Sequence, residues 1–266
     1  MVKRRSRWQN LGRGVTPMVF LVIILAIWEI LVRVNDVPGY LLPAPSSVFL
    51  TFIKNLSVLL DHSKTSLLET LAGLGIALII GIVLAVLMDI HRIIRQALYP
   101  LLVVSQSVPA IVLAPIFLVY FGFGWTPKIL TVVLMCFFPI VVNIADGMAE
   151  VSPDQIHLLK SFGAKPYQIY LHGKIPAALP TLFSGLRVAA TYGLSGAIVG
   201  EWLSASHGLG YYLLRVKNAN RMDLVFATVL ILILWSLALN GLVVIIERLL
   251  LRRPYRGKAT AKKGTP

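Results

Sequence analysis

The sequence predicts an all-α membrane protein with six transmembrane helices, a short helical loop between helices four and five, and both termini in the cytoplasm. Three observations lead to this fold class. Hydrophobic residues make up 57% of the 266 residues and mean hydropathy is +0.81, which is high for a soluble domain of this length. Six apolar stretches are long enough, at roughly 20 residues each, to cross a bilayer as helices. Basic residues gather at both ends of the chain, where they flank these stretches.

Each apolar stretch is one predicted span, and the spans define the domain organisation. We expect a basic cytoplasmic tail at 1–16, a transmembrane domain at 17–251 and a second basic cytoplasmic tail at 252–266. The loop between spans four and five occupies about residues 150–180. The six spans are expected at 17–34, 67–88, 98–120, 129–145, 182–200 and 224–247.

Charge asymmetry orients the predicted spans. With both termini inside, the inside segments carry 17 lysines and arginines and the outside segments carry six. Basic residues hold short segments on the cytoplasmic side, so this asymmetry places the 150–180 loop in the cytoplasm. The net charge of +14 is therefore explained by membrane topology, and we expect no nucleic-acid partner. The six basic residues expected outside are Lys54, Lys64, Lys128, Arg215, Lys217 and Arg221.

Spans two and five each carry a small residue at every fourth position, which makes one stripe along one helix face. Helices in lipid gain little from hydrophobic association, so close backbone approach over small residues supplies packing contacts instead. Both spans are therefore expected in the interior of the bundle, whereas span six has no such stripe and is expected to face lipid. The stripes are Gly73, Ala77, Gly81 and Ala85, and Gly185, Ala189, Gly193 and Ala197.

Span three contains Pro109 and Pro115, and proline removes a backbone donor and kinks a helix. Two interpretations remain open. The freed carbonyl groups line a polar pathway, or neighbouring helices satisfy them. Polarity inside the spans selects five candidate pathway residues, Ser105, Gln106, Ser107, Asn143 and Tyr192, and the kink beside them adds Pro109 as the sixth.

Motifs for chemistry are absent from the sequence. It has no phosphate-binding G-x-x-x-x-G-K-[ST], no H-E-x-x-H and no G-x-S-x-G, so we predict that the chain is not an enzyme and holds no cofactor. No two of the five histidines have ligand spacing on one helix, and the single Cys136 excludes a multi-cysteine site, so no metal is expected. A membrane-embedded enzyme would therefore lack any starting motif.

Charges inside the spans are few. Glu69 and Arg187 are the only plausible intramembrane charges, and both are expected within about two turns of a span end. Ion-driven transporters usually need buried carboxylates, so this class is disfavoured. It remains the alternative hypothesis, with coupling through Glu69 or Asp146.

The segment around the loop Leu158–Pro180 is predicted to form two short helices that meet at Gly163. The first is expected at 155–162 with Pro153 near its start, and the second at 164–171 with Pro166 in its first turn. Prolines 176 and 180 are expected to stiffen the return into span five. Helix, glycine corner and helix make a rigid elbow that can transmit force from a partner, which we favour over an ordinary connector.

The loop resembles the cytoplasmic loop of ABC importer permeases, whose motif runs E-A-A, three residues, Gly, nine residues, Ile, one residue and Leu-Pro. Gly163 and Pro176 match, His157-Leu158-Leu159 replaces E-A-A, Gly173 replaces Ile and Ile175 replaces Leu. Flanking stretches resemble the nitrate, taurine and aliphatic-sulfonate branch almost end to end. Among them, GEWL (200–203), GLGYYLLR (208–215) and CFFPIVVN (136–143) are most similar to permeases for pyrimidine precursors of thiamine. The other stretches are YLLPAPSSV (40–48), SQSVPAIVLAPIFLVYFGFG (105–124), SFGAKPYQIY (161–170) and IPAALPTLFSGLRVAATYG (175–193).

This resemblance implies the membrane subunit of an ATP-driven importer in the bacterial inner membrane. Two permease chains, expected as a homodimer, would form the pathway, two ATPase subunits would hold ATP and magnesium, and an external binding protein would deliver the solute. The implied solute is a hydroxymethylpyrimidine-type thiamine precursor, with aliphatic sulfonate, taurine or nitrate as alternatives. The residues implied in ATPase coupling are His157, Leu158, Leu159, Ser161, Gly163, Ala164, Pro166 and Pro176.

Overall fold

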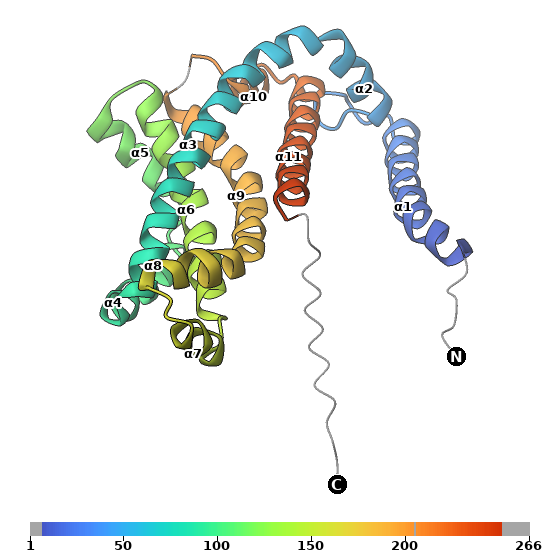
Figure 1. Ribbon diagram of the computed structural model, residues 1–266. Helices are drawn as coiled ribbons and strands as arrows, with labels where there is room; N and C mark the ends of the chain where they lie inside the picture. The colour runs from blue at the N-terminus through green and yellow to red at the C-terminus, as the bar shows by residue number, and fades with distance from the viewer. Residues whose placement is uncertain (1–6, 205, 252–266) are drawn as a thin grey trace.

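The computed structural model describes residues 7–204 and 206–251, and this part of the chain is helical without strands. The predicted tail 252–266 and residues 1–6 of the other tail lie outside the described residues. Helix α1 (Arg7–Val34) begins at Arg7, so residues 7–16 of the predicted tail continue the first span as helix. Figure 1 shows α1 standing apart from the other long helices, to which it is joined through α2 (Pro45–Lys54).

Three long helices form the centre of the molecule (Figure 1): α3 (Leu56–Ile90), α6 (Trp125–Ala149) and α9 (Ile175–Ser204). Their buried core includes Val132, Cys136 and Ile140 of α6, which have no exposed surface. Helix α11 (Met222–Leu250) packs on α9 through Leu239 and Val243 and leaves many of its apolar side chains on the outside.

Small residues bring α3 and α9 onto α6. An added Cβ at Gly73 would lie 2.5 Å from Val132, and one at Gly81 would lie 2.7 Å from Ile140. On α9, a Cβ at Gly185 would lie 2.6 Å from the backbone oxygen of Pro139. The four stripe alanines, Ala77, Ala85, Ala189 and Ala197, have no exposed surface. These contacts leave no room for larger side chains at the centre of the bundle.

The third apolar stretch forms two helices instead of one kinked span. Helix α4 (Arg92–Ser105) and helix α5 (Ala110–Phe121) meet at an angle of 100°. The break lies at 106–109 because Pro109 cannot continue the hydrogen-bonding pattern of α4 and instead precedes the first residue of α5. Within the described residues, five helices are long and apolar enough to cross a membrane, and the bent pair makes a sixth span if it is counted as one.

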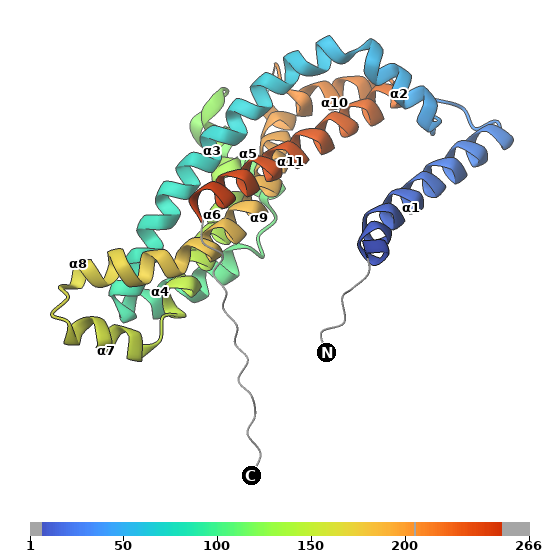
Figure 2. The same cartoon turned by 45° about the vertical axis from the view of Figure 1, so that its right-hand side comes forward.

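Short helices cover the two ends of the bundle. Helices α2 and α10 (Leu209–Asn218) lie at one end, and α4, α7 (Pro153–Ser161) and α8 (Pro166–Ile169) lie at the other (Figure 1). Figure 2 shows α7 and α8 projecting beyond the long helices as a corner. Two regions are candidate functional sites: the projecting corner formed by α7 and α8, and the space beside the break between α4 and α5.

Candidate functional site: a projecting elbow and a polar cavity

The first half of the projecting corner is the nine-residue helix α7. The Ser152 hydroxyl accepts a hydrogen bond from the Gln155 amide at 3.3 Å, and Pro153 occupies the first helical position. Asp154 lies in the first turn and Lys160 in the last, both favourable with the helix dipole. The observed range, Pro153–Ser161, agrees with the expected helix at 155–162 to within two residues.

Gly163 ends α7 in the left-handed conformation, with φ of +76°. The Gly163 amide donates to the Lys160 carbonyl at 2.9 Å and the Ala164 amide donates to the Leu159 carbonyl at 3.1 Å. These two bonds form a Schellman motif, which favours glycine at this position because it has no Cβ. The corner is therefore a fixed turn.

The second half of the corner differs from the expectation. The separate helix predicted at 164–171 is wrong, because α8 passes through a π-helical turn, η1 (Tyr170–Lys174), directly into α9. The Gln168 side chain accepts from the Lys165 amide at 2.7 Å and starts this helix at Pro166. Pro176 lies in α9 just after the π-helical turn and Pro180 lies inside α9, so both prolines belong to the continuous helix and do not stiffen a loop. One arm of the elbow is thus an extension of a central span.

The π-helical turn is fastened to the end of α3. Asp89 accepts hydrogen bonds from the Tyr170 hydroxyl and from the Lys174 ammonium, each at 2.5 Å. The Asp89 carboxylate is 6% exposed and the Lys174 side chain 16%. Single π-helical turns inside α-helices are frequent at functional sites. The elbow is therefore connected to both α9 and α3.

Apolar side chains project from the elbow and are not covered by the other described residues. Phe162 is 80% exposed, Tyr167 62% and Leu158 58%. His157 and Ser161 lie on helix α7 with Leu158, and the Ser161 hydroxyl donates to the His157 carbonyl at 3.0 Å. Apolar side chains grouped on a rigid projection are typical of a protein docking surface.

The second region is a cavity of about 520 Å³ between the broken span and helices α6 and α9. Five of the six predicted pathway residues line it: Ser105, Gln106, Pro109, Asn143 and Tyr192. Ser107, the sixth, is in the same break but is not among its lining residues. The break between α4 and α5, where the two helices meet at 100°, borders this cavity.

The cavity is lined by aromatic rings and neutral polar groups. Phe137, Phe138 and Tyr192 supply rings, and Ser105, Gln106 and Asn143 supply hydroxyl and carboxamide groups. The Asn143 amide donates to the Pro139 carbonyl at 2.7 Å, which leaves its oxygen available as an acceptor. Among the described lining residues none is charged. Such a surface suits an uncharged solute with hydrogen-bonding groups.

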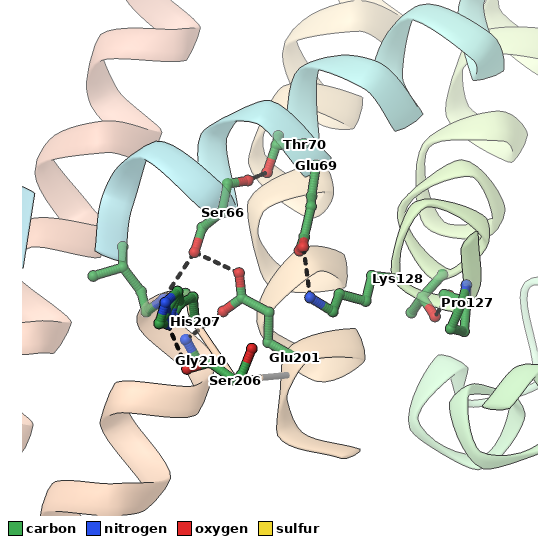
Figure 3. Close-up of polar contacts among 12 residues, drawn as sticks. Ser66, Glu69, Thr70, Pro127, Lys128, Glu201, Ser206, His207 and Gly210 are labelled. Atoms are coloured by element: carbon green, nitrogen blue, oxygen red, sulfur yellow. Dashed lines mark hydrogen bonds and ion pairs between the residues drawn. The ribbon is translucent and has the colours of Figure 1, made fainter. Parts of the chain in front are cut away.

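Sequence reasoning missed a buried ionic cluster at the opposite end from the elbow. Figure 3 shows Glu69 of α3, Lys128 of α6 and Glu201 of α9 converging. The Lys128 ammonium donates to Glu69 at 2.8 Å, and Glu69 has no exposed surface. Lys128 was expected outside the bilayer and Glu69 within about two turns of a span end. In the structure Lys128 lies inside helix α6, which begins at Trp125, and Glu69 lies inside α3, which begins at Leu56, so both helices are longer than the apolar spans expected from the sequence.

The chain matches a family model described as the inner membrane component of binding-protein-dependent transport systems, over residues 77–253. The chain belongs to this family of permeases. A probable ABC transporter permease of Haemophilus influenzae is 34% identical over 85% of this permease and 93% of its own length. The formylaminopyrimidine transport permease ThiX of Halalkalibacterium halodurans is 36% identical over 92% of this permease and 98% of its own length. Other relatives are named as permeases for aliphatic sulfonates, taurine and nitrate.

The fold is that of a chain in a solved ABC transporter. The permease resembles a chain of the inward-facing MetNI methionine ABC transporter, with a TM-score of 0.57, 18% identity and coverage of 72% of this permease and 93% of that chain. The predicted family and helical membrane fold are confirmed. The permease is a multi-pass inner membrane subunit of an ABC importer that works with a binding protein, and ATP hydrolysis takes place on a separate subunit.

Proposed function

We propose that two copies of this permease form the pathway of an importer, and that two ATPase subunits grip the α7–α8 elbow on the cytoplasmic side. The observation that carries this proposal is the elbow itself, a Schellman corner with exposed apolar side chains whose second arm continues into α9. The partner needs such a rigid arm because a mobile loop would absorb the movement. The coupling residues, from His157 to Pro176, all lie on α7, the corner or the helix that follows it.

A matched pair of glycine substitutions tests the docking role. Gly163 and Gly122 both have positive φ, at +76° and +71°, both have nothing near an added Cβ, and both amides donate one backbone hydrogen bond. Gly163→Pro and Gly122→Pro therefore carry similar local strain, but only Gly163 lies in the elbow. We expect the ATPase to co-purify with wild type and Gly122→Pro and to be lost from Gly163→Pro.

The opposite results point to the alternative class. If the ATPase is retained by Gly163→Pro, the elbow is not its docking site. A second result would also favour this class. If no ATPase associates with any variant, and the purified chain alone takes up solute into liposomes when an ion gradient is applied, the permease is an ion-coupled transporter. Neutralisation of Glu69 or Asp146 would then abolish uptake.

We propose an uncharged pyrimidine of the hydroxymethylpyrimidine type as the solute. The name of the relative ThiX supports a pyrimidine, and the neutral aromatic lining of the cavity supports it independently. Nitrate, taurine and aliphatic sulfonates carry a negative charge on the group to be recognised, and burial of an unpaired charge is costly. The reconstituted importer should take up labelled hydroxymethylpyrimidine, and excess taurine or nitrate should not compete.

The proposed second copy is supported by what lies next to the cavity. Helix α5 borders it and carries strongly exposed apolar residues at its end, among them Val119, Tyr120 and Phe121. A facing copy would cover this helix and close the cavity into a pathway between two chains. Cysteine cross-linking of Tyr120→Cys in a Cys136→Ala background should give a permease dimer in membranes, whereas a cysteine at exposed Val19 of α1 should not.

A further inference from the structure

Three charged side chains are buried together at the end of the bundle where α10 lies. Glu69 is 0% exposed, Glu201 1% and Lys128 6%. They come from three different helices, and Figure 3 shows both carboxyl groups pointing into the same space. Unpaired charges are expensive in such a place, so the cluster must be neutralised from within.

The Glu201 carboxylate holds the beginning of α10. One of its oxygens, Oε2, accepts from the Gly210 amide at 2.5 Å, and Oε1 accepts from the Ser66 hydroxyl at 2.6 Å. The same Ser66 oxygen accepts from the Leu209 amide at 2.8 Å. Two of the amide groups at the start of α10, which a helix leaves without internal partners, are therefore satisfied by side chains of α9 and α3.

Two glycines permit this contact. Gly208 has φ of +119°, and an added Cβ would lie 2.3 Å from the Glu201 carboxyl group. A Cβ on Gly210 would lie 2.9 Å from Glu201 Oε2 and 2.6 Å from the Ile198 carbonyl oxygen. The G-L-G sequence at 208–210 is therefore required for the backbone to reach the carboxylate.

The charges of this cluster do not balance if both carboxyl groups are ionised. Lys128 contributes one positive charge, and its ammonium group contacts Glu69 Oε1. Glu69 Oε2 is buried and has no hydrogen-bond partner among the described residues, and the Glu201 carboxyl group points into the same space (Figure 3). Two carboxyl groups that share a buried site hold one proton between them. One proton therefore supplies the missing donor and makes the cluster neutral.

We propose that Glu69 and Glu201 share one proton, and that this carboxyl pair, with Lys128 as its counter-ion, is a latch that fastens the start of α10 to the bundle. Release of the proton would leave one uncompensated negative charge among buried groups and weaken the attachment of α10. The latch thus makes the position of α10 depend on protonation. It does not depend on which solute the permease carries.

Other titratable groups face the same end of α10. The Nδ1 atom of His62, on α3, accepts a hydrogen bond from the Gly208 amide at 3.2 Å, so this nitrogen carries no proton. Its ring stacks on Tyr212 of α10 with ring centroids 4.9 Å apart and lies 6.0 Å from the His207 ring. Burial raises the pKa of the Tyr212 phenol, which therefore stays neutral, and Arg215 adds a positive charge nearby. Acid would charge His62 and remove its contact, so the latch is tested at neutral and alkaline pH.

Infrared spectroscopy of the purified full chain tests the shared proton directly. Ordinary carboxyl groups are ionised at neutral pH, so wild type should show a neutral carboxylic-acid band that shifts when glutamate is labelled with carbon-13. The band should be absent from Glu69→Gln and from Glu201→Gln, because the remaining carboxylate then balances Lys128. It should persist in Glu150→Gln, whose side chain is exposed.

The labelled wild type keeps the test decisive even if a variant fails to fold. Of the other glutamates, Glu29 pairs with Arg33, Glu247 pairs with Arg187, and Glu150 is exposed, so a labelled neutral band belongs to the cluster. Absence of such a band in wild type, or its survival in both glutamine variants, would overturn the proposal.

Hydrogen exchange tests the latch. Glu201→Ala should raise exchange at the Leu209 and Gly210 amides by roughly ten- to hundredfold, the effect of losing a hydrogen bond to a charged group. The same amides should exchange as in wild type in Glu150→Ala. Unchanged exchange in Glu201→Ala would show that the carboxylate does not hold α10.

Discussion

The ammonium group of Lys174 lies 2.5 Å from the carboxylate of Asp89, and this pair joins the start of α9 to the end of α3. The Tyr170 hydroxyl donates to the same carboxylate. Because Lys174 belongs to the π-helical turn and Asp89 to α3, force applied to the elbow is shared between two of the three central helices. Their sequence separation of 85 residues hides this link from any local pattern.

Breaking this pair should uncouple the importer without preventing its assembly. We expect Asp89→Asn to keep the ATPase bound and to lower solute transported per ATP hydrolysed by about tenfold, since the loss of a largely buried charge partner commonly costs more than 1.4 kcal/mol. Reconstituted proteoliposomes with binding protein and ATPase measure this ratio. The charge exchange Asp89→Lys with Lys174→Asp should recover part of the coupling, and no recovery would argue against the pair as the link.

The exposed side chains of the elbow should dominate its affinity for the ATPase. Phe162→Ser removes a large apolar side chain from the proposed docking surface, and we expect affinity to fall by roughly ten- to a hundredfold. Titration of the ATPase against the detergent-solubilised permease gives this value. Leu41→Ser is the control, because Leu41 is 66% exposed and lies near α2, at the other end of the molecule. Equal losses in both variants would indicate a general effect of surface polarity.

One methyl group added between α9 and α6 should destabilise the protein. Gly185→Ala would place a Cβ 2.6 Å from a backbone oxygen, which cannot move independently of α6. We expect a loss of about 1–3 kcal/mol in the free energy of unfolding. Thermal unfolding in detergent, followed by tryptophan fluorescence, checks this. Gly75→Ala on α3 and Gly241→Ala on α11 meet no atoms and should leave the midpoint unchanged or slightly higher.

The cavity should affect transport through solute recognition. Asn143→Leu keeps a similar volume and removes a carboxamide, so we expect KM for hydroxymethylpyrimidine to rise by roughly tenfold. Basal ATPase activity of the assembled importer should be retained. Tyr120→Phe provides the comparison, because Tyr120 is exposed and does not line the cavity. A fall in the maximal rate at unchanged KM would assign Asn143 to packing and not to solute binding.

Lys128 should be far more important for stability than an exposed lysine. Lys128→Met leaves Glu69 buried without a counter-ion, and we expect a cost of about 3–5 kcal/mol. Replacing both Glu69 and Glu201 by Gln in the Lys128→Met chain should recover much of this loss, because no buried carboxylate is then left without a counter-ion. Lys64→Met breaks the exposed pair with Asp61 and should cost less than about 1 kcal/mol. Thermal midpoints of the four chains, measured in one detergent, make the comparison.

The positions of the spans and the ends of α7 follow from the local sequence alone. The apolar stretches specify spans because a bilayer demands helices of that length, and Ser152, Pro153 and Gly163 specify the ends of α7 because capping and positive φ are properties of a few residues. The small-residue stripes predicted that α3 and α9 lie at the centre, because small residues allow the close backbone approach of neighbouring helices. Five of the six pathway candidates line one cavity, and four of them were selected by polarity, because a polar side chain in an apolar span needs an environment that satisfies it.

Tertiary structure decided the features that depend on partners distant in the chain. The 100° bend at 106–109 could not be read from two prolines, since proline permits either a kink or a break and neighbouring helices select between them. Glu69, Lys128 and Glu201 are separated by up to 132 residues and look like ordinary charges near span ends in the sequence. The continuous helix from α8 into α9 depends on Asp89, which holds the π-helical turn from another helix. Composition and local geometry decide where helices form, but a buried charge becomes tolerable only where folding brings its counter-charge to it.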